Sequence, residues 1–303
     1  MAKKAVLFYN PQAGHSKENR QCKLIKEHFA NHDIDLQMVF VPKPYADLKG
    51  IIDSAVSDGA ELFIAAGGDG TVSMISTHLV GTKYPLGIIP LGIGNLLSKA
   101  MHIPQKLEQA LDLVTADVHL KSKIDTIKFD DRFFLMNVSV GISPRIIGSV
   151  NSEQKQKLGF LAYLINFAQQ ILGLKMHRFF VECDHQESSH LASEIFITNI
   201  GTAGVEPLVW SDDISLNDGT MNLLIIRATN FRDLFRLIVS IFTKKSKVNP
   251  KIKFMKVNEY CRIDSDSPLK IQADGDIIGE TPFEVHVFPS SLTIIAGKNP
   301  NAN

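Results

Sequence analysis

The sequence of 303 residues predicts an α/β domain with a parallel sheet, followed by a β-rich domain. Three observations predict this arrangement. Strand-like and helical segments alternate over residues 1–122, and the runs at 5–8 and 62–66 are almost continuously apolar, which suits a parallel sheet covered on both faces. From residue 123 onward, strand-like runs follow one another with few helices between them, which favours an antiparallel sandwich or open barrel. We therefore expect domains at 1–122 and 123–303, and leave open whether the last strand returns to the first domain.

The expected elements of the first domain alternate in order, with short right-handed connections. Ser16 is a candidate N-cap for the first helix, and Gly59 closes the second. The strands are expected at residues 5–9, 36–41, 62–66 and 86–90, and the helices at 16–30, 45–58, 72–80, 96–101 and 105–115.

The second domain is expected to begin with a hairpin around Asp130 and Asp131, formed by strands 124–129 and 133–138. One apolar helical stretch follows at 158–174. Further strands are expected at 179–183, 194–199, 221–227, 260–264, 269–273 and 284–288. A helix at 231–242 has two possible roles. Its apolar positions match a core-facing helix, through Leu234, Leu237, Ile238 and Ile241. The lysines that follow it would instead suit an interfacial helix with a basic end, formed by Lys244, Lys245 and Lys247.

Composition narrows the class of protein. Hydrophobic residues make up 45 % of the chain, and 32 basic residues balance 32 acidic ones, which argues against wholesale nucleic-acid binding. The three cysteines lie far apart without a CxxC pair, so we expect neither a metal finger nor a disulfide scaffold, and a reducing cytoplasm fits. No signal-peptide core and no uncharged apolar run of the roughly 18 residues that span a bilayer is found.

Three glycine-bearing loops, each directly after a buried strand, carry most of the functional information. A strand that ends in a glycine-rich turn and leads into a helix leaves backbone N–H groups available to bind anions, and ligands of open α/β sheets bind along that edge. The implied ligand is a polyphosphate, and a nucleotide is the expected one. The loops consist of Asn10, Pro11, Gln12, Ala13 and Gly14; Gly67, Gly68, Asp69, Gly70 and Thr71; and Gly92, Ile93, Gly94 and Asn95.

The order of these motifs resembles the diacylglycerol kinase catalytic family. Asn-Pro-x-x-Gly at residue 10 and Gly-Gly-Asp-Gly-Thr at residue 67 are similar to the first two family motifs, and residues 90–95 to the third. Asn217-Asp218-Gly219-Thr220 and Asp274-Gly275-Asp276 are similar to its two late segments. The resemblance implies a nucleotide domain like those of phosphofructokinases and NAD kinases, a β-rich domain, and phosphorylation of a lipid with ATP and Mg²⁺.

Residue roles follow from the chemistry and from this resemblance. The loops would cradle the ATP phosphates, while Asp69 orients the nucleotide or a Mg²⁺-bound water. The resemblance assigns the general base to Asp276. Asp274 is a second candidate, because Asp at position 276 has a shorter reach than the family's Glu. The two carboxylates flank Gly275 in an expected strand-end turn, and residues i and i+2 of a strand point the same way. The resemblance also implies a structural metal site that draws on Ser215, Asp218 and Thr220, whose oxygen ligands suit Mg²⁺.

Several positions depart from the family pattern: Phe40, Ser73, Met74, Ile93 and Leu96. These departures leave open the alternative that the protein is a catalytically weak homologue that binds a nucleotide or a lipid. A further alternative is an NAD-kinase-like enzyme with a soluble acceptor. The partner expected for the kinase is a lipid at a membrane surface, reached by transient peripheral contact from the cytoplasm. A homodimer is also left open.

Overall fold

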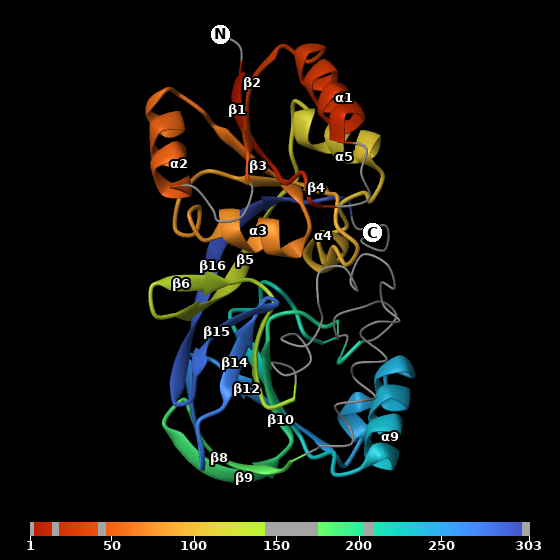
Figure 1. Cartoon of the computed structure of the whole chain (residues 1–303), viewed down its shortest axis with the longest axis vertical. Helices are drawn as coiled ribbons and strands as arrows, with labels where there is room; N and C mark the ends of the chain where they lie inside the picture. The colour runs from red at the N-terminus through yellow and green to blue at the C-terminus, as the bar shows by residue number, and fades with distance from the viewer. Residues whose placement is uncertain are drawn as a thin grey trace. The chain divides into compact units, whose positions relative to one another are not determined.

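The computed structural model describes residues 3–13, 18–41, 47–142, 175–202, 209–211 and 213–298 (Figure 1). The chain forms two compact units: residues 1–124 together with 290–303, and residues 125–289. The first unit is α/β with a mainly parallel sheet, and the second is an antiparallel β structure. The predicted fold class is therefore confirmed.

The sheet of the first unit places its strands in the order β2-β1-β3-β4, all parallel. The end of the long last strand β16 lies parallel to β4, with Ile294 opposite Leu86. The last strand thus begins in the second unit and ends in the first. The strand bounds are β1 Lys3–Tyr9, β2 Ile34–Phe40, β3 Leu62–Gly67, β4 Leu86–Pro90 and β16 Phe283–Ile295.

Helices cover both faces of this sheet, which explains why its strands are apolar throughout. Along β1, Leu7 and Tyr9 face one side, where they share a core with Ile25 of α1 and Leu111 of α5. Val6 and Phe8 are equally buried and alternate toward the other side. Figure 1 shows α2 on the opposite side from α1 and α5. The helices are α1 Glu18–Ala30, α2 Leu48–Ser57, α3 Asp69–Ser76, α4 Leu96–Ala100 and α5 Leu107–Thr115.

The second unit is a sandwich, because one core cluster contains inward residues from two different sheets. Val181 and Ile263 come from the sheet of β8, β9, β13 and the first part of β16, whereas Ile197 and Ile225 come from the other sheet. That second sheet has the order β12-β11-β10-β7-β14-β15. Its strands are β7 Asn137–Val140, β10 Glu194–Thr198, β11 Met221–Ile226, β12 Ile252–Val257, β14 Lys270–Ala273 and β15 Asp276–Glu280. The sheet that contains the first part of β16 has these further strands: β5 Lys121–Phe129, β6 Arg132–Phe134, β8 His177–Cys183, β9 Gln186–Ala192 and β13 Tyr260–Ser265.

A helix, α9 (Phe231–Phe242), covers the outer face of the six-stranded sheet. Leu224 and Ile226 of β11 point outward and pack with Leu237 and Ile241 of the helix. β11 is therefore buried on both faces, which accounts for its apolar sequence. No helix within the described ranges is long and apolar enough to cross a membrane.

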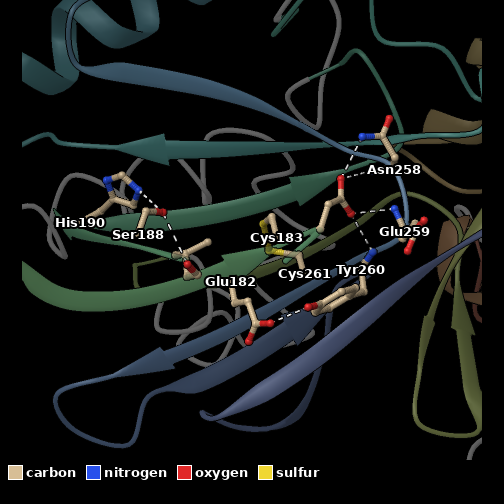
Figure 2. The surroundings of a disulfide bond; sticks show 10 residues. Glu182, Cys183, Ser188, His190, Asn258, Glu259, Tyr260 and Cys261 are labelled. Carbon is tan, nitrogen blue, oxygen red and sulfur yellow. Dashed lines mark hydrogen bonds between the residues drawn. A yellow bond between two sulfur atoms is a disulfide. The ribbon is translucent and has the colours of Figure 1, made fainter. Parts of the chain in front are cut away.

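The structure corrects the expectation about cysteines. Cys183 of β8 and Cys261 of β13 lie directly opposite each other and form a disulfide, buried in the sandwich core (Figure 2). The sequence did not predict this pair, because 78 residues separate the two cysteines and only the strand pairing brings them together. Cys22 remains a free thiol.

Next to the disulfide, Asp184 fixes the turn between β8 and β9. Its carboxylate accepts backbone hydrogen bonds from Asn258, Glu259 and Tyr260, and one from the Asn258 side chain. Burial tends to raise the pKa of Asp184, but these four hydrogen bonds outweigh it and lower the pKa below its ordinary value.

Some element bounds differ from expectation. The strand predicted at 133–138 is two strands, β6 and β7, because Leu135 and Met136 donate their N–H groups to Asp274 instead of a neighbouring strand. Three strands were not predicted, β9, β12 and β15. The helix expected at 158–174 lies outside the described residues.

Candidate active site

The three glycine loops follow β1, β3 and β4, which are adjacent parallel strands of the first unit. The carboxyl ends of adjacent parallel strands meet at one edge of a sheet. The structure therefore brings the loops together, and only Gly14 lies outside the described residues.

Asn10 joins the first loop to the second. Its Nδ2 donates to Thr71 Oγ1 at 2.9 Å, its Oδ1 accepts from Gln12 N at 2.9 Å, and its backbone N–H donates to Ala66 O at 3.0 Å. Because Thr71 is buried, this hydrogen bond holds the start of α3 against the end of β1. Pro11 and Gln12 occupy the turn closed by the hydrogen bond from Ala13 N to Asn10 O.

Asp69 joins the second loop to the third. It is the first residue of α3, and its Oδ1 accepts from Leu97 N at 3.4 Å. A Cβ atom built on Gly94 would lie 2.9 Å from Asp69 Oδ2, so the third loop passes close to this carboxylate. A half-buried carboxylate is thus held between two helix N-termini, those of α3 and α4.

Glycine is required where the second and third loops touch. A Cβ atom on Gly92 would lie 2.6 Å from the Cα of Gly68 and 2.8 Å from Asn95 Oδ1. Real Cβ atoms do not approach backbone this closely, so any side chain at Gly92 would push the loops apart. Gly67 is equally constrained, because its Cβ atom would lie 2.5 Å from Thr71 Oγ1.

Asn95 ends the third loop in the left-handed conformation, with φ of 50°. Asn tolerates this region better than most residues, which explains its place before α4. Its Nδ2 donates to Gly92 O at 2.9 Å and to Gln105 Oε1 at 3.2 Å, so the Asn95 side chain joins the start of the loop to the segment that follows α4. Ile93, by contrast, is 66 % exposed at the tip of the same loop.

Asp274, Gly275 and Asp276 lie at a turn at the end of a strand, as expected. Asp274 and Gly275 are the two turn residues between β14 and β15, with φ of 45° and 98°, and Asp276 begins the return strand. Positive φ at both turn positions is typical of a type I′ hairpin, for which Asp-Gly is a preferred pair.

The two carboxylates have different surroundings. Asp274 accepts backbone hydrogen bonds from Leu135 at 2.8 Å, and from Met136 and Asn137 at 3.0 Å each. Both of its oxygens therefore organise the chain between β6 and β7. Asp276 is exposed at the start of β15.

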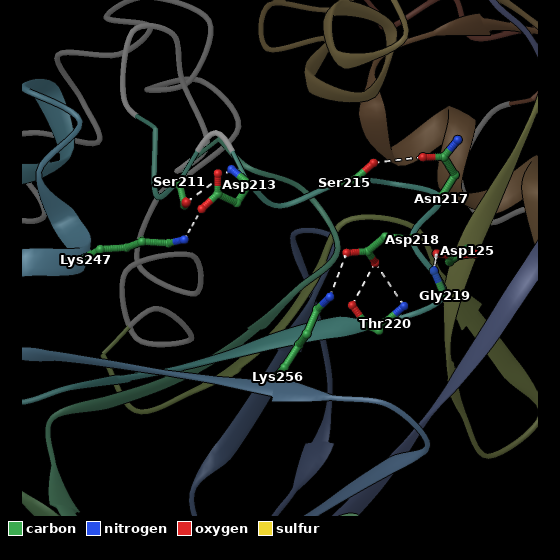
Figure 3. Close-up of polar contacts among 10 residues, drawn as sticks. All are labelled: Asp125, Ser211, Asp213, Ser215, Asn217, Asp218, Gly219, Thr220, Lys247 and Lys256. Atoms are coloured by element: carbon green, nitrogen blue, oxygen red, sulfur yellow. Dashed lines mark hydrogen bonds and ion pairs between the residues drawn. The ribbon is translucent and has the colours of Figure 1, made fainter.

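The proposed metal ligands in the second unit form contacts of their own (Figure 3). Asp218 Oδ1 accepts from the backbone and hydroxyl of Thr220, at 3.0 and 2.7 Å, while its Oδ2 pairs with Lys256 at 3.3 Å. Ser215 Oγ donates to Asn217 Oδ1 at 2.8 Å. The described residues contain no group of three or more His, Cys, Asp or Glu able to hold a metal ion. Asp218 is thus paired with Lys256, and the Mg²⁺ site that the resemblance implies at these oxygens stays a prediction.

Asp125 was missed in the sequence. It lies on β5, is 1 % exposed, and accepts a hydrogen bond of 2.7 Å from Gly219 N (Figure 3). Its own N–H donates to Leu216 O, so Asp125 holds both sides of the loop that carries Asp218. The available signal was an acidic residue between the apolar Ile124 and Ile127 of an expected strand, since a buried carboxylate needs dedicated partners.

Comparison with known families now decides the family. Residues 4–128 match the diacylglycerol kinase catalytic domain, and residues 136–296 match the YegS C-terminal NAD kinase beta sandwich-like domain, which covers more than half of the chain. The chain belongs to the diacylglycerol kinase catalytic-domain family. The resemblance noted in the sequence is therefore confirmed.

Individual relatives are distant. A diacylglycerol kinase of Staphylococcus aureus is 27 % identical over 288 residues, covering 93 % of this chain and 89 % of the relative. An uncharacterized protein of Synechocystis is 29 % identical over 303 residues, covering 96 % of this chain and 69 % of that protein. The crystal structure of a diacylglycerol kinase from Bacillus anthracis has a TM-score of 0.80 at 22 % identity, with 98 % of each chain covered, which shows a shared fold.

Proposed function

We propose that this kinase-family protein transfers the γ-phosphoryl group of ATP to the hydroxyl of a lipid, with diacylglycerol or a sphingoid base as the acceptor. The observation that carries the proposal is the set of three glycine loops, joined by Asn10, Thr71 and Asp69 at one edge of a parallel sheet. Such loops and the N-terminus of α3 offer N–H donors to phosphate oxygens. The family and the name of the S. aureus relative support a lipid acceptor.

The proposed reaction uses two carboxylates. The acceptor hydroxyl oxygen attacks the γ-phosphorus, its proton passes to Asp276, and the bond from the γ-phosphorus to the bridging oxygen breaks to release ADP. We assign the base to Asp276 and not to Asp274, because Asp274 is bound to three backbone N–H groups.

Asp69 fits a Mg²⁺ ion that arrives with ATP. Such an ion takes most of its ligands from phosphates and water, so one carboxylate beside the loops is sufficient, in contrast to the Lys256-paired Asp218. When bound, the ion would neutralise charge that develops on the phosphoryl oxygens. Asp69 itself keeps its orientation through Leu97 N.

The proposal is tested by transfer of label from γ-labelled ATP to defined acceptors. Diacylglycerol and sphingosine in detergent micelles, and NAD in solution, are compared for the wild type, D69A, D276N and the exposed-carboxylate control D131N. We expect a labelled lipid for the wild type and D131N. D276N should lose at least about a hundredfold, the range for removal of a general base, and D69A should lose transfer because the Mg²⁺ ion is no longer oriented. Full transfer by a folded D69A variant would refute the proposed mechanism.

A second candidate is a nucleotide- or lipid-binding homologue with little turnover. The observation that favours it is Ile93, an exposed apolar residue at the tip of a loop proposed to face phosphates. This alternative predicts ATP binding without transfer above background to any acceptor. Label on NAD in place of lipid would instead identify a soluble-substrate kinase.

A further inference from the structure

Helix α9 presents an apolar stripe that the core does not use. Its inner face is accounted for by Leu237 and Ile241, each 5 % exposed and packed on the six-stranded sheet. On the other side, Phe235, Val239 and Phe242 are 58 %, 43 % and 59 % exposed. Residues spaced by four and three lie on one side of a helix, so these three form a continuous stripe. The sequence therefore encodes two apolar faces on one surface helix.

Basic residues flank the stripe. Arg232 and Arg236 are exposed, one helical turn apart, on the side next to Val239. No carboxylate within the described part of the chain pairs with Arg232, Arg236 or Lys245. Two further lysines, Lys244 and Lys247, follow the helix, and Val248 beside them is 78 % exposed.

The acidic residues nearby pair with lysines and not with the two arginines of the helix. Asp233 is 5 % exposed and pairs with Lys251 at 2.9 Å, on the inner side of the helix. Asp213 pairs with Lys247. A chain with no net charge thus concentrates basic side chains around its exposed aromatic stripe.

We propose that the outer face of α9 docks on an anionic lipid bilayer. The docking face consists of Arg232, Phe235, Arg236, Val239 and Phe242. Aromatic residues beside arginines suit the boundary between headgroups and acyl chains, and the positive charge is complementary to anionic lipid. The helix has 12 residues, or roughly 18 Å, so it would lie in the plane of the surface and not cross it. The role of this docking, which is to bring the enzyme to a lipid substrate, rests on the proposed function. Binding of α9 to the bilayer does not itself require catalysis.

The docking face can be tested by vesicle flotation of the full chain. Phosphatidylcholine vesicles are compared with vesicles containing a quarter phosphatidylglycerol, for the wild type, F235Q/F242Q and R232E/R236E. Phe180 of β8 supplies the control, because it is 49 % exposed and lies outside the docking face, so F180Q removes an apolar area similar to that of one of the two α9 phenylalanines. Circular dichroism and thermal melting confirm that each variant is folded.

We expect the wild type and F180Q to float with anionic vesicles and to bind neutral vesicles more weakly. Each basic residue near an anionic surface changes partitioning by about fivefold, so R232E/R236E should bind at least about tenfold more weakly. F235Q/F242Q should lose binding to both vesicle types. Wild-type levels of flotation for both double variants, or an equal loss in F180Q, would overturn the proposal.

Two further measurements separate this inference from its alternatives. Light scattering measures the mass of each variant, and a wild-type dimer that the F235Q/F242Q variant loses would show that a second copy covers the face, which overturns bilayer docking. Transfer to a short-chain, monomeric diacylglycerol should be unchanged in the α9 variants while transfer to vesicle-embedded substrate falls. Vesicle binding by a wild type that phosphorylates no lipid would refute the proposed function alone and support the docking face.

Discussion

At the scale of single residues, two carboxylates only two positions apart have different tasks. Asp274 binds the N–H groups of residues 135–137, whereas Asp276 is exposed. The motif Asp-Gly-Asp could be recognised in the sequence, but this division could not. It depends on segments 137 to 139 residues apart that are brought together only by the sheet.

The division predicts different effects on stability. D274A leaves three backbone N–H groups without their acceptor, and we expect it to lower the free energy of unfolding by at least about 2 kcal/mol. D276A removes an exposed carboxylate and should stay within about 0.5 kcal/mol of the wild type. Urea denaturation measures both, and equal stability of the two variants would contradict the division.

A second residue-scale prediction concerns the contact between the glycine loops. In G92A the new methyl group would clash with the Cα of Gly68 at 2.6 Å, so we expect a loss of about 1–3 kcal/mol and weaker ATP binding. Gly70 is the matched control, because a Cβ atom there meets nothing within 4 Å and the residue lies in α3. G70A should melt at or slightly above the wild-type temperature. Melting of G92A at the wild-type temperature would contradict the close approach.

At the scale of elements, α9 begins with a reciprocal set of hydrogen bonds. The Asn230 side chain accepts from Asp233 N at 3.0 Å, and Asp233 Oδ2 accepts from the backbone and hydroxyl of Thr229. Lys251 completes the set. Hydrogen bonds from Lys251 and Thr229 lower the pKa of Asp233 to about 2.

This shift predicts an acid-sensitive helix. Because the pKa in the folded state lies below the ordinary value, the stabilisation is present at neutral pH and is lost as the pH falls from about 4 through 2. D233N should be less stable than the wild type by about 1–2 kcal/mol at pH 7, allowing for solvent around Lys251, and the difference should vanish near pH 2. Urea denaturation across this range tests it, with D131N as control. A difference independent of pH would contradict the assignment.

Elements were predictable where their sequence pattern matched their burial. The four parallel strands of the first unit were recognised because apolar runs and glycine turns coincide. β9 and β15 were missed because they are polar or short, and β15 is paired on one side only. For α9 the sequence left open a core-facing stripe and an interfacial helix with a basic end, and the packing of Leu237 and Ile241 confirms the core-facing stripe. Which apolar residues face outward depends on the packing of the sheet beneath.

At the scale of the whole molecule, the family and the fold class followed from the order of five short segments spread along the chain. The tertiary contacts could not be predicted in this way. The disulfide, the buried Asp125 and the pairing of Asp218 with Lys256 each join residues distant in sequence. The motifs indicated the family, whereas the structure distinguished the exposed carboxylate of Asp276 from the hydrogen-bonded carboxylate of Asp274.

The central claim, phosphorylation of a lipid hydroxyl, is tested most directly by identifying the product. A total lipid extract is incubated with the protein, Mg²⁺ and ATP carrying ¹⁸O in its γ-phosphoryl group, and the lipids are examined by mass spectrometry. We predict a new lipid phosphomonoester that carries the label and is missing with D276N. Label found only in inorganic phosphate, or retained in ATP, would contradict the assignment of this protein as a lipid kinase.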